Sequence, residues 1–137
     1  MVSRFLEERG LLCKVVLSAV PFPIHELFVV SGVPLGMVRG NHAHKVVHQY
    51  LICLEGEVRV TITNMNRKTY EVTLTPEGPE LHIPPRIWAS QTYLTLDARL
   101  LVFTSGEYDL GEYFQNLDNF YESFRDDDPQ SQEVKFL

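Results

Sequence analysis

The chain has 137 residues, of which 45% are apolar and 22% charged, and these values indicate one globular domain rather than a disordered chain. Lys and Arg total 12 against 18 Asp and Glu, so the formal net charge of −6 offers no general attraction for nucleic acid or an anionic membrane. No apolar run approaches the roughly 18 residues of a membrane span, and residues 1–10 lack the apolar core of a signal peptide. We therefore expect one cytoplasmic domain that binds neither nucleic acid nor membrane.

Short β-strands separated by turn signals are predicted over the first hundred residues. The clearest alternation is in residues 57–63, where Val58, Val60 and Ile62 face one way and polar side chains face the other. The predicted strands are 11–17, 26–30, 49–54, 57–63, 68–75, 81–83, 90–96 and 99–103, with reversals at 55–56, 64–67 and 76–79. This spacing is typical of an all-β sandwich or barrel such as a jelly roll.

The hydrophobic period changes near the C-terminus. Aromatic and aliphatic residues recur there at helical spacing, at Tyr113, Leu117, Phe120, Tyr121 and Phe124. This pattern predicts a short amphipathic helix of about three turns, whose aromatic stripe packs in the core or in a dimer interface. We expect a single domain over residues 1–125, followed by an acidic and polar C-terminal tail over residues 126–137.

Two cysteines, Cys13 and Cys53, lie in apolar stretches of the sequence. Their surroundings favour buried free thiols in a reducing compartment, and a disulfide between them is the alternative.

The segment 36–56, GMVRGNHAHKVVHQYLICLEG, carries the most informative spacing in the chain. It reads Gly36, five residues, His42, one residue, His44, four residues, Gln49, six residues, Gly56. This spacing resembles the first motif of the cupin family, which has Glu where Gln49 stands. The resemblance implies a small β-barrel, in which cupins bind a divalent metal through the two histidines and that Glu.

The second cupin motif supplies a further histidine ligand after a Gly and a Pro. On that frame Gly78 and Pro84 match, and Ala89 occupies the place of the ligand. Gln49 has no negative charge and Ala89 cannot ligate, so two imidazoles remain without an anionic partner. We therefore predict a barrel with no functional metal and no other cofactor, whose histidines are available for acid–base chemistry.

His42 and His44 are two residues apart, so on a strand both side chains point to one face, which is the lumen of a small barrel. Imidazole moves protons near neutral pH. The alternative is that both are satisfied interior histidines, although the neighbouring Arg39 then has no evident use. Three further histidines are expected at the surface or in supporting positions, namely His25, His48 and His82.

The run Arg39-Gly40-Asn41-His42-Ala43-His44-Lys45, followed by Gln49, resembles the sugar 3,4-ketoisomerase family more closely than cupins in general. These enzymes act on thymidine-diphosphate-linked 4-keto-6-deoxyhexoses in deoxysugar biosynthesis. The resemblance extends over most of the chain. It includes Arg9-Gly10-Leu11, Pro21-Phe22, Val58-Arg59-Val60, the segment from Pro84 to Trp88, and the run from Glu107, Tyr108 and Asp109 to Tyr113 and Phe120.

The resemblance implies a metal-independent isomerase that moves a carbonyl from C4 to C3 of the sugar through an enediol. His42 is then the proton shuttle, and His44 orients it or handles an enediol oxygen. The candidate substrate-binding residues are Arg9, Arg39 and Arg59 for the diphosphate, Gln49 for an imidazole or a sugar hydroxyl, and Trp88 and Tyr108. Trp88 has core packing as its alternative. The resemblance also implies a homodimer, with Phe5, Phe22 and the aromatic stripe as candidate interface groups.

Three positions depart from the family pattern. Glu26 stands where a basic residue is usual, Phe28 where a Tyr is usual, and Ala89 where a His is frequent. These departures keep two alternatives open. One is a related isomerase or epimerase acting on another nucleotide sugar, and the other is a catalytically silent cupin that binds a sugar nucleotide.

Overall fold

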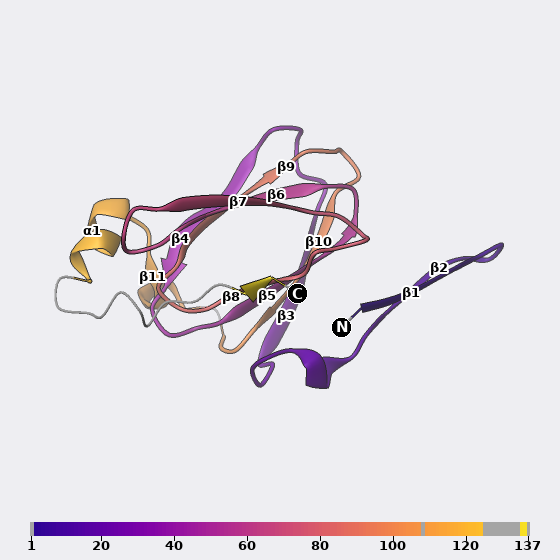
Figure 1. Cartoon of the computed structure of the whole chain (residues 1–137), viewed down its shortest axis with the longest axis horizontal. Coiled ribbons are helices and arrows are strands. Elements are labelled where there is room, and N and C mark those ends of the chain that lie inside the picture. Colours follow the sequence, from indigo (N-terminus) through magenta and orange to yellow (C-terminus); the bar gives the residue numbers. More distant parts are fainter. Residues whose placement is uncertain (1, 108, 125–134, 137) are drawn as a thin grey trace.

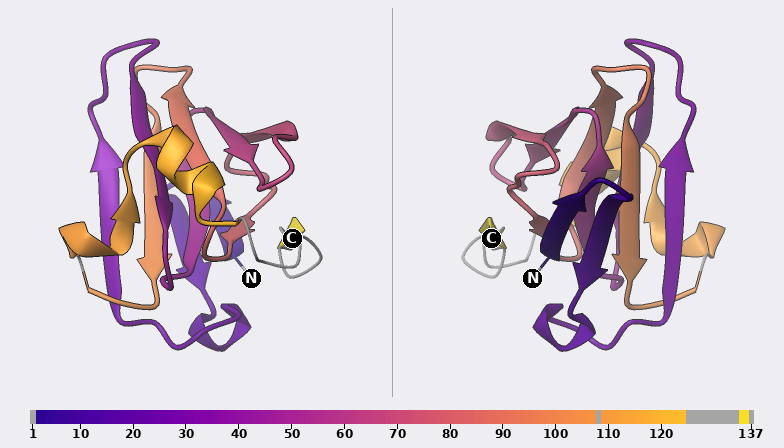
Figure 2. Two further views of the ribbon diagram at one scale, coloured as in Figure 1. Left: turned by 90° about the vertical axis from the view of Figure 1, so that its left-hand side faces the viewer. Right: turned by 90° about the vertical axis from the view of Figure 1, so that its right-hand side faces the viewer.

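Residues 2–107, 109–124 and 135–136 are described by the structure, a computed structural model of the chain. Most of its strands form two facing sheets (Figures 1 and 2). The strands are β1 (Val2–Glu7), β2 (Gly10–Val15), β3 (Glu26–Ser31), β4 (Val38–His44), β5 (Gln49–Glu55), β6 (Val58–Thr63), β7 (Thr69–Leu74), β8 (Leu81–Ile83), β9 (Trp88–Tyr93), β10 (Arg99–Thr104), β11 (Tyr113–Phe114) and β12 (Lys135–Phe136). Single 3-10 turns lie at Leu17–Ala19 and Leu110–Glu112, and the helix α1 spans Leu117–Glu122.

The two large sheets have five strands each. Their strand orders are β12-β8-β5-β10-β3 and β11-β4-β9-β6-β7, and β1 and β2 form a separate hairpin. Neighbouring strands within the sheets are antiparallel. This arrangement confirms the predicted all-β jelly roll with a short C-terminal helix.

The core lies between the two sheets, and β6 shows how the sequence builds it. Val58, Val60 and Ile62 point inward and are at most 2% exposed, as their alternation predicts. Full burial of each such side chain contributes about 1.5–3 kcal/mol. Arg59 alternates with them and pairs with Thr92 of β9, so it lies on the outer face of the sheet.

The eight predicted strands all occur, and the predicted reversals connect them. Four strands were not predicted as such: β1, β4, β11 and β12. The last two are two residues long, too short to show a period. In β4, Gly40 and Asn41 interrupt the alternation, because both adopt positive φ.

The helix α1 covers the outer face of the sheet that contains β4 and β9, at the left of Figure 1. Phe120 and Phe124 are buried there in a cluster with Ala43, and Trp88 packs against the same cluster. The core interpretation of these aromatics is therefore confirmed. The predicted length of three turns is wrong, because Tyr113 and Phe114 pair with β4 and the Asn116 side chain caps a helix that begins at Leu117.

The outer face of the other sheet is covered by the segment between β2 and β3. Tyr50, Ile52 and Phe103 form a cluster there with Val20, against which Phe22 is partly buried. Beyond this cluster the β1–β2 hairpin projects from the body of the molecule, at the right of Figure 1.

Both cysteines are free thiols, Cys53 buried and Cys13 half-buried, and burial raises the pKa of Cys53 to about 11. The buried Cys53 is therefore unreactive near neutral pH. In the described part of the chain there is no helix with the length and apolar character that a membrane crossing needs.

Candidate active site

A cavity of about 500 Å³ opens between the two sheets, a volume suited to a small-molecule ligand. Both sheets contribute to its walls. The polar and charged residues that line it include Glu26, Arg39, His42, His44, Gln49, Gln91, Thr104, Glu107, Glu112, Tyr113 and Gln115. Apolar side chains close the rest, among them Phe28, Val30, Leu51, Leu100 and Val102.

A β-bulge in β4 brings Arg39 to the same wall as the histidines. Arg39 and His42 are three residues apart, a separation that places side chains on opposite faces of a regular strand. The register of β4 against β9 shifts between Gly40 and His42, with φ of 90° at Gly40 and 56° at Asn41. A Cβ at Gly40 would lie 3.1 Å from the Ala89 carbonyl oxygen, so this position favours glycine for space as well as for φ.

His42 and His44 lie side by side on the inner face, as their spacing predicts. Their ring centroids are 5.0 Å apart in an edge-to-face arrangement. Tyr113 of β11 contacts both rings, with a centroid distance of 4.6 Å to each. The two imidazoles are thus held by packing within the cavity wall.

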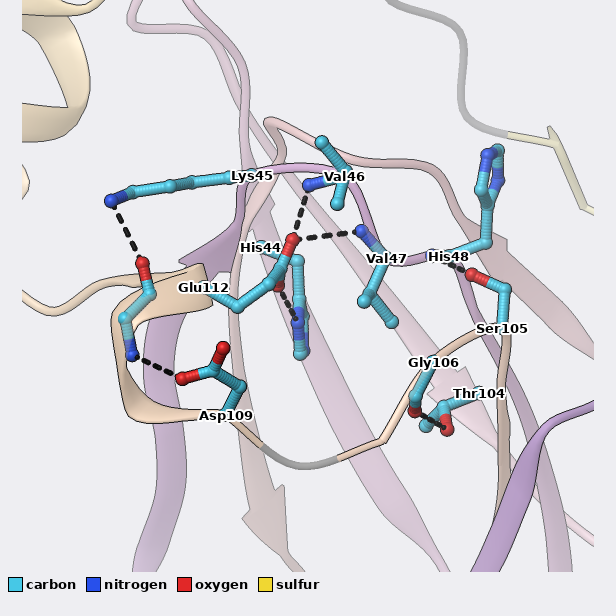
Figure 3. Close-up of polar contacts among 11 residues, drawn as sticks. His44, Lys45, Val46, Val47, His48, Thr104, Ser105, Gly106, Asp109 and Glu112 are labelled. Atoms are coloured by element: carbon cyan, nitrogen blue, oxygen red, sulfur yellow. Dashed lines mark hydrogen bonds and ion pairs between the residues drawn. The ribbon is translucent and has the colours of Figure 1, made fainter.

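The Glu112 carboxylate contacts the Nδ1 side of the His44 ring (Figure 3). The His44 Nδ1 lies 2.8 Å from Oε2 of Glu112, and the two side chains are only 9% and 12% exposed. The other carboxylate oxygen, Oε1, accepts hydrogen bonds from the backbone amides of Val46 and Val47. Sequence reasoning missed Glu112. The sequence feature that could have pointed to Glu112 is its position directly before Tyr113 in the C-terminal aromatic run.

Burial lowers the pKa of both His42 and His44 below the ordinary value of 6.5. A hydrogen bond with the Gly40 backbone opposes this shift for His42, and the hydrogen bond with Glu112 opposes it for His44. Desolvation is the larger influence in each case. Both rings are therefore neutral at pH 7 and able to accept a proton.

Comparison with known proteins places this chain in a family. The profile of the WxcM-like, C-terminal family (FdtA) matches residues 2–125. The chain belongs to this family.

Relatives of this WxcM-like chain include enzymes of known activity. It is 30% identical over 119 residues to the TDP-4-oxo-6-deoxy-alpha-D-glucose-3,4-oxoisomerase of Aneurinibacillus thermoaerophilus, covering 86% of this chain and 85% of the relative. A mutant of the 3,4-ketoisomerase QdtA from Thermoanaerobacterium thermosaccharolyticum, in complex with TDP-4-keto-6-deoxyglucose, superposes with a TM-score of 0.81 at 26% identity, covering 93% of this chain and 94% of its own. NovW, a 4-keto-6-deoxy sugar epimerase from Streptomyces spheroides, shares the fold at 17% identity, with a TM-score of 0.67 over 82% of this chain and 64% of its own.

The structure of this WxcM-like chain brings together four of the residues singled out from sequence. His42, His44, Arg39 and Gln49 all line the cavity. Glu26 and Phe28, two of the three departures, also line it, so these departures lie at the site itself.

The remaining sequence candidates lie elsewhere. Arg9 is at the turn of the β1–β2 hairpin, 87% exposed and paired with Glu7. Arg59 is on the outer face of β6, and Trp88 packs against Phe120 of α1 with ring centroids 5.8 Å apart. These three side chains do not line the cavity of their own chain. Tyr108 lies outside the described residues.

The donor set of this WxcM-like site does not fit a cupin metal. Gln49 stands beside the two histidines, and Ala89 pairs directly with His42 across β4 and β9. The nearby carboxylate of Glu112 is occupied by His44 Nδ1 and two backbone amides. Within the described residues, no group of three or more His, Cys, Asp or Glu side chains is arranged to hold a metal ion.

Proposed function

We propose that this chain is a metal-independent 3,4-ketoisomerase of deoxysugar biosynthesis, acting on a TDP-linked 4-keto-6-deoxyhexose. The observation that carries the proposal is the pair of neutral imidazoles on one cavity wall, with Arg39 beside them and Glu112 bound to His44. Membership of the WxcM-like family and the named activities of its relatives support this choice.

The reaction needs two proton movements, one between carbons and one between oxygens. His42 takes the proton from C3, and the C–H electrons form a C3=C4 double bond while negative charge develops on O4. His44 accepts the proton of the C3 hydroxyl at Nε2 and returns it to O4. The protonated His42 then delivers its proton to C4 as the C3 carbonyl forms. Protons and electrons balance, and the sugar is isomerised without net oxidation.

Substrate binding follows from the other cavity residues. The Arg39 guanidinium offers a fork of donors suited to a diphosphate, and Gln49 can bond to a sugar hydroxyl. Glu26 and Phe28 give the cavity wall a different charge and hydrogen-bonding capacity from the basic residue and Tyr that are usual in the family. This difference favours a second candidate function, that of an isomerase or epimerase for a different nucleotide sugar.

We propose in addition that the chain forms a homodimer. An isolated two-stranded hairpin is marginally stable in water, yet β1–β2 leaves Phe5, Leu6, Leu11 and Leu12 at least half exposed. The strand β3 forms one end of its sheet and exposes Leu27 and Val29. Addition of the hairpin of one copy to β3 of a second would cover both surfaces. It would also bring the partner's hairpin, which carries Arg9, alongside the strand that supplies Glu26 and Phe28 to the cavity.

The test is incubation with TDP-4-keto-6-deoxyglucose in deuterium oxide, followed by NMR at C3 and C4. A TDP-3-keto product supports the isomerase. Tight binding with neither product nor exchange at C3 refutes it and leaves a silent binding protein.

His42→Asn is expected to lose turnover by about 10²–10⁴-fold. The matched control is His25→Asn, because His25 is exposed and does not line the cavity. Full turnover by His42→Asn would sink the shuttle assignment.

A further inference from the structure

The two ring nitrogens of His44 have different surroundings. Nδ1 lies 2.8 Å from Oε2 of Glu112. Nε2 is buried and has no hydrogen-bond partner among the described residues, and the ring lines the cavity. A buried polar atom without a partner is unusual in a folded protein and requires an explanation.

The carboxylate of Glu112 is fixed in place (Figure 3). Its Oε1 accepts from the amides of Val46 and Val47, so Oε2 is left to face His44. The backbone is fixed as well, because the amide of Lys45 donates to the Glu112 carbonyl at 2.8 Å and the Lys45 ammonium donates to the Gly111 carbonyl at 2.9 Å. The residue therefore presents one oxygen to the imidazole in a single orientation.

An ionised carboxylate can only accept hydrogen bonds. The nitrogen that faces it must therefore carry the hydrogen, and in a neutral imidazole the other nitrogen must then carry the lone pair. We propose that Glu112 is a positioning residue that fixes His44 in the Nδ1–H tautomer, so that the unpartnered Nε2 carries the lone pair and is the proton acceptor of the ring.

The catalytic consequence rests on the proposed function, in which Nε2 takes a proton from one sugar oxygen and returns it to the other. While that proton is held, the ring is an imidazolium, and the adjacent carboxylate stabilises its charge. Glu112 thus acts through His44 without touching the substrate. The tautomer itself is a property of the unliganded protein and does not depend on which substrate is bound.

The decisive variant is Glu112→Gln. The side-chain oxygen of Gln can replace Oε1 at the two backbone amides, so the loop from His44 to Val47 keeps its hydrogen bonds. The amide nitrogen then faces Nδ1 as a donor, which requires the lone pair at Nδ1 and moves the ring hydrogen to Nε2. The substitution is therefore expected to invert the tautomer while leaving the fold intact.

The measurement is ¹⁵N NMR of the histidine side chains in unliganded protein, combined with kcat and KM for the TDP-keto sugar. We expect Nδ1–H in the wild type, Nε2–H in Glu112→Gln, and a kcat lower by about 10²–10⁴-fold with little change in KM. Asp109→Asn is the matched control. It removes one charge from the same loop at a residue that accepts from the Gly111 amide, and should leave tautomer and kcat unchanged.

A wild-type His44 with its hydrogen on Nε2 would overturn the proposal even if every variant failed to fold. Glu112→Gln with an unchanged tautomer and unchanged kcat would overturn it as well. If the tautomer inverts but the wild type isomerises no keto sugar, the proposed function fails and the positioning role of Glu112 stands. The two failures are thus distinguishable.

Discussion

His42 and Ala89 stand directly opposite one another in the ladder between β4 and β9. Ala89 is 6% exposed and belongs to the inner core, so its methyl group lies on the same side of the sheet as the imidazole. A histidine at this position would complete a cupin ligand set, together with a carboxylate at position 49.

This relationship yields a prediction about metal affinity. The double variant Gln49→Glu/Ala89→His should bind Zn²⁺ or Mn²⁺ at least about tenfold more tightly than the wild type, because it adds an anionic ligand and a third imidazole. Calorimetric titration of the metal-free proteins measures the difference. The larger side chain at position 89 carries an overpacking cost of about 1–3 kcal/mol, which thermal unfolding reports. Equal affinity in both proteins would show that these two positions are not what limits metal binding.

A second prediction concerns the pH dependence of catalysis. Because burial lowers the pKa of His42 and His44, both rings stay neutral, and competent as acceptors, to a lower pH than an exposed imidazole. The acidic limb of kcat/KM against pH, which reports the free enzyme, should therefore lie below 6.5. A limb at or above 6.5 would contradict the cavity environment described for these residues.

The same shifts contribute to the pH dependence of stability. In the unfolded chain both histidines titrate near 6.5, whereas in the folded chain they titrate lower, so the unfolded state binds more protons as the pH falls through 6.5. Their contribution to the free energy of unfolding is therefore complete above 6.5 and decreases below it. Urea unfolding at pH 7.5 and pH 5.5 measures the decrease, which should be smaller in His42→Asn.

Most of the strands and the inward-facing core could be predicted from the sequence, because the alternation of apolar residues and the turn residues are local features of the chain. Val58, Val60 and Ile62 marked their strand, and the two-residue spacing of His42 and His44 placed both in the lumen. Contacts between distant segments were not available from local pattern. Glu112 reaches His44 across 68 residues. The alternation of β6 already placed Arg59 opposite the inward-facing Val58 and Val60, so its assignment to the diphosphate depended on the family resemblance alone.

A fourth prediction concerns Glu26, which places negative charge in a cavity proposed to hold a diphosphate. Glu26→Gln should raise kcat/KM for the TDP-keto sugar, by about threefold or more at low ionic strength, because it removes a repulsive charge while keeping the volume. The gain should shrink as salt is added, since salt screens exposed charges. Glu71→Gln on β7, which does not line the cavity, is the matched control. A fall in kcat/KM for Glu26→Gln would instead indicate that the carboxylate bonds to the sugar and selects the substrate.

The last prediction concerns the β1–β2 hairpin and the edge strand β3. Leu6 and Leu11 are paired across the hairpin and are 84% and 50% exposed in the isolated chain, which is unfavourable for adjacent apolar side chains in water. If the hairpin of one copy lies against β3 of another, Leu6→Glu/Leu11→Glu places two like charges in that interface and should convert a dimer to a monomer in analytical ultracentrifugation. Leu96→Glu is the matched control, because Leu96 is 72% exposed in the connection between β9 and β10, away from the hairpin. A wild-type monomer, or a dimer that survives both hairpin charges, would refute the exchange. A monomeric variant with lowered kcat/KM would in turn indicate that the hairpin contributes to the site of its partner.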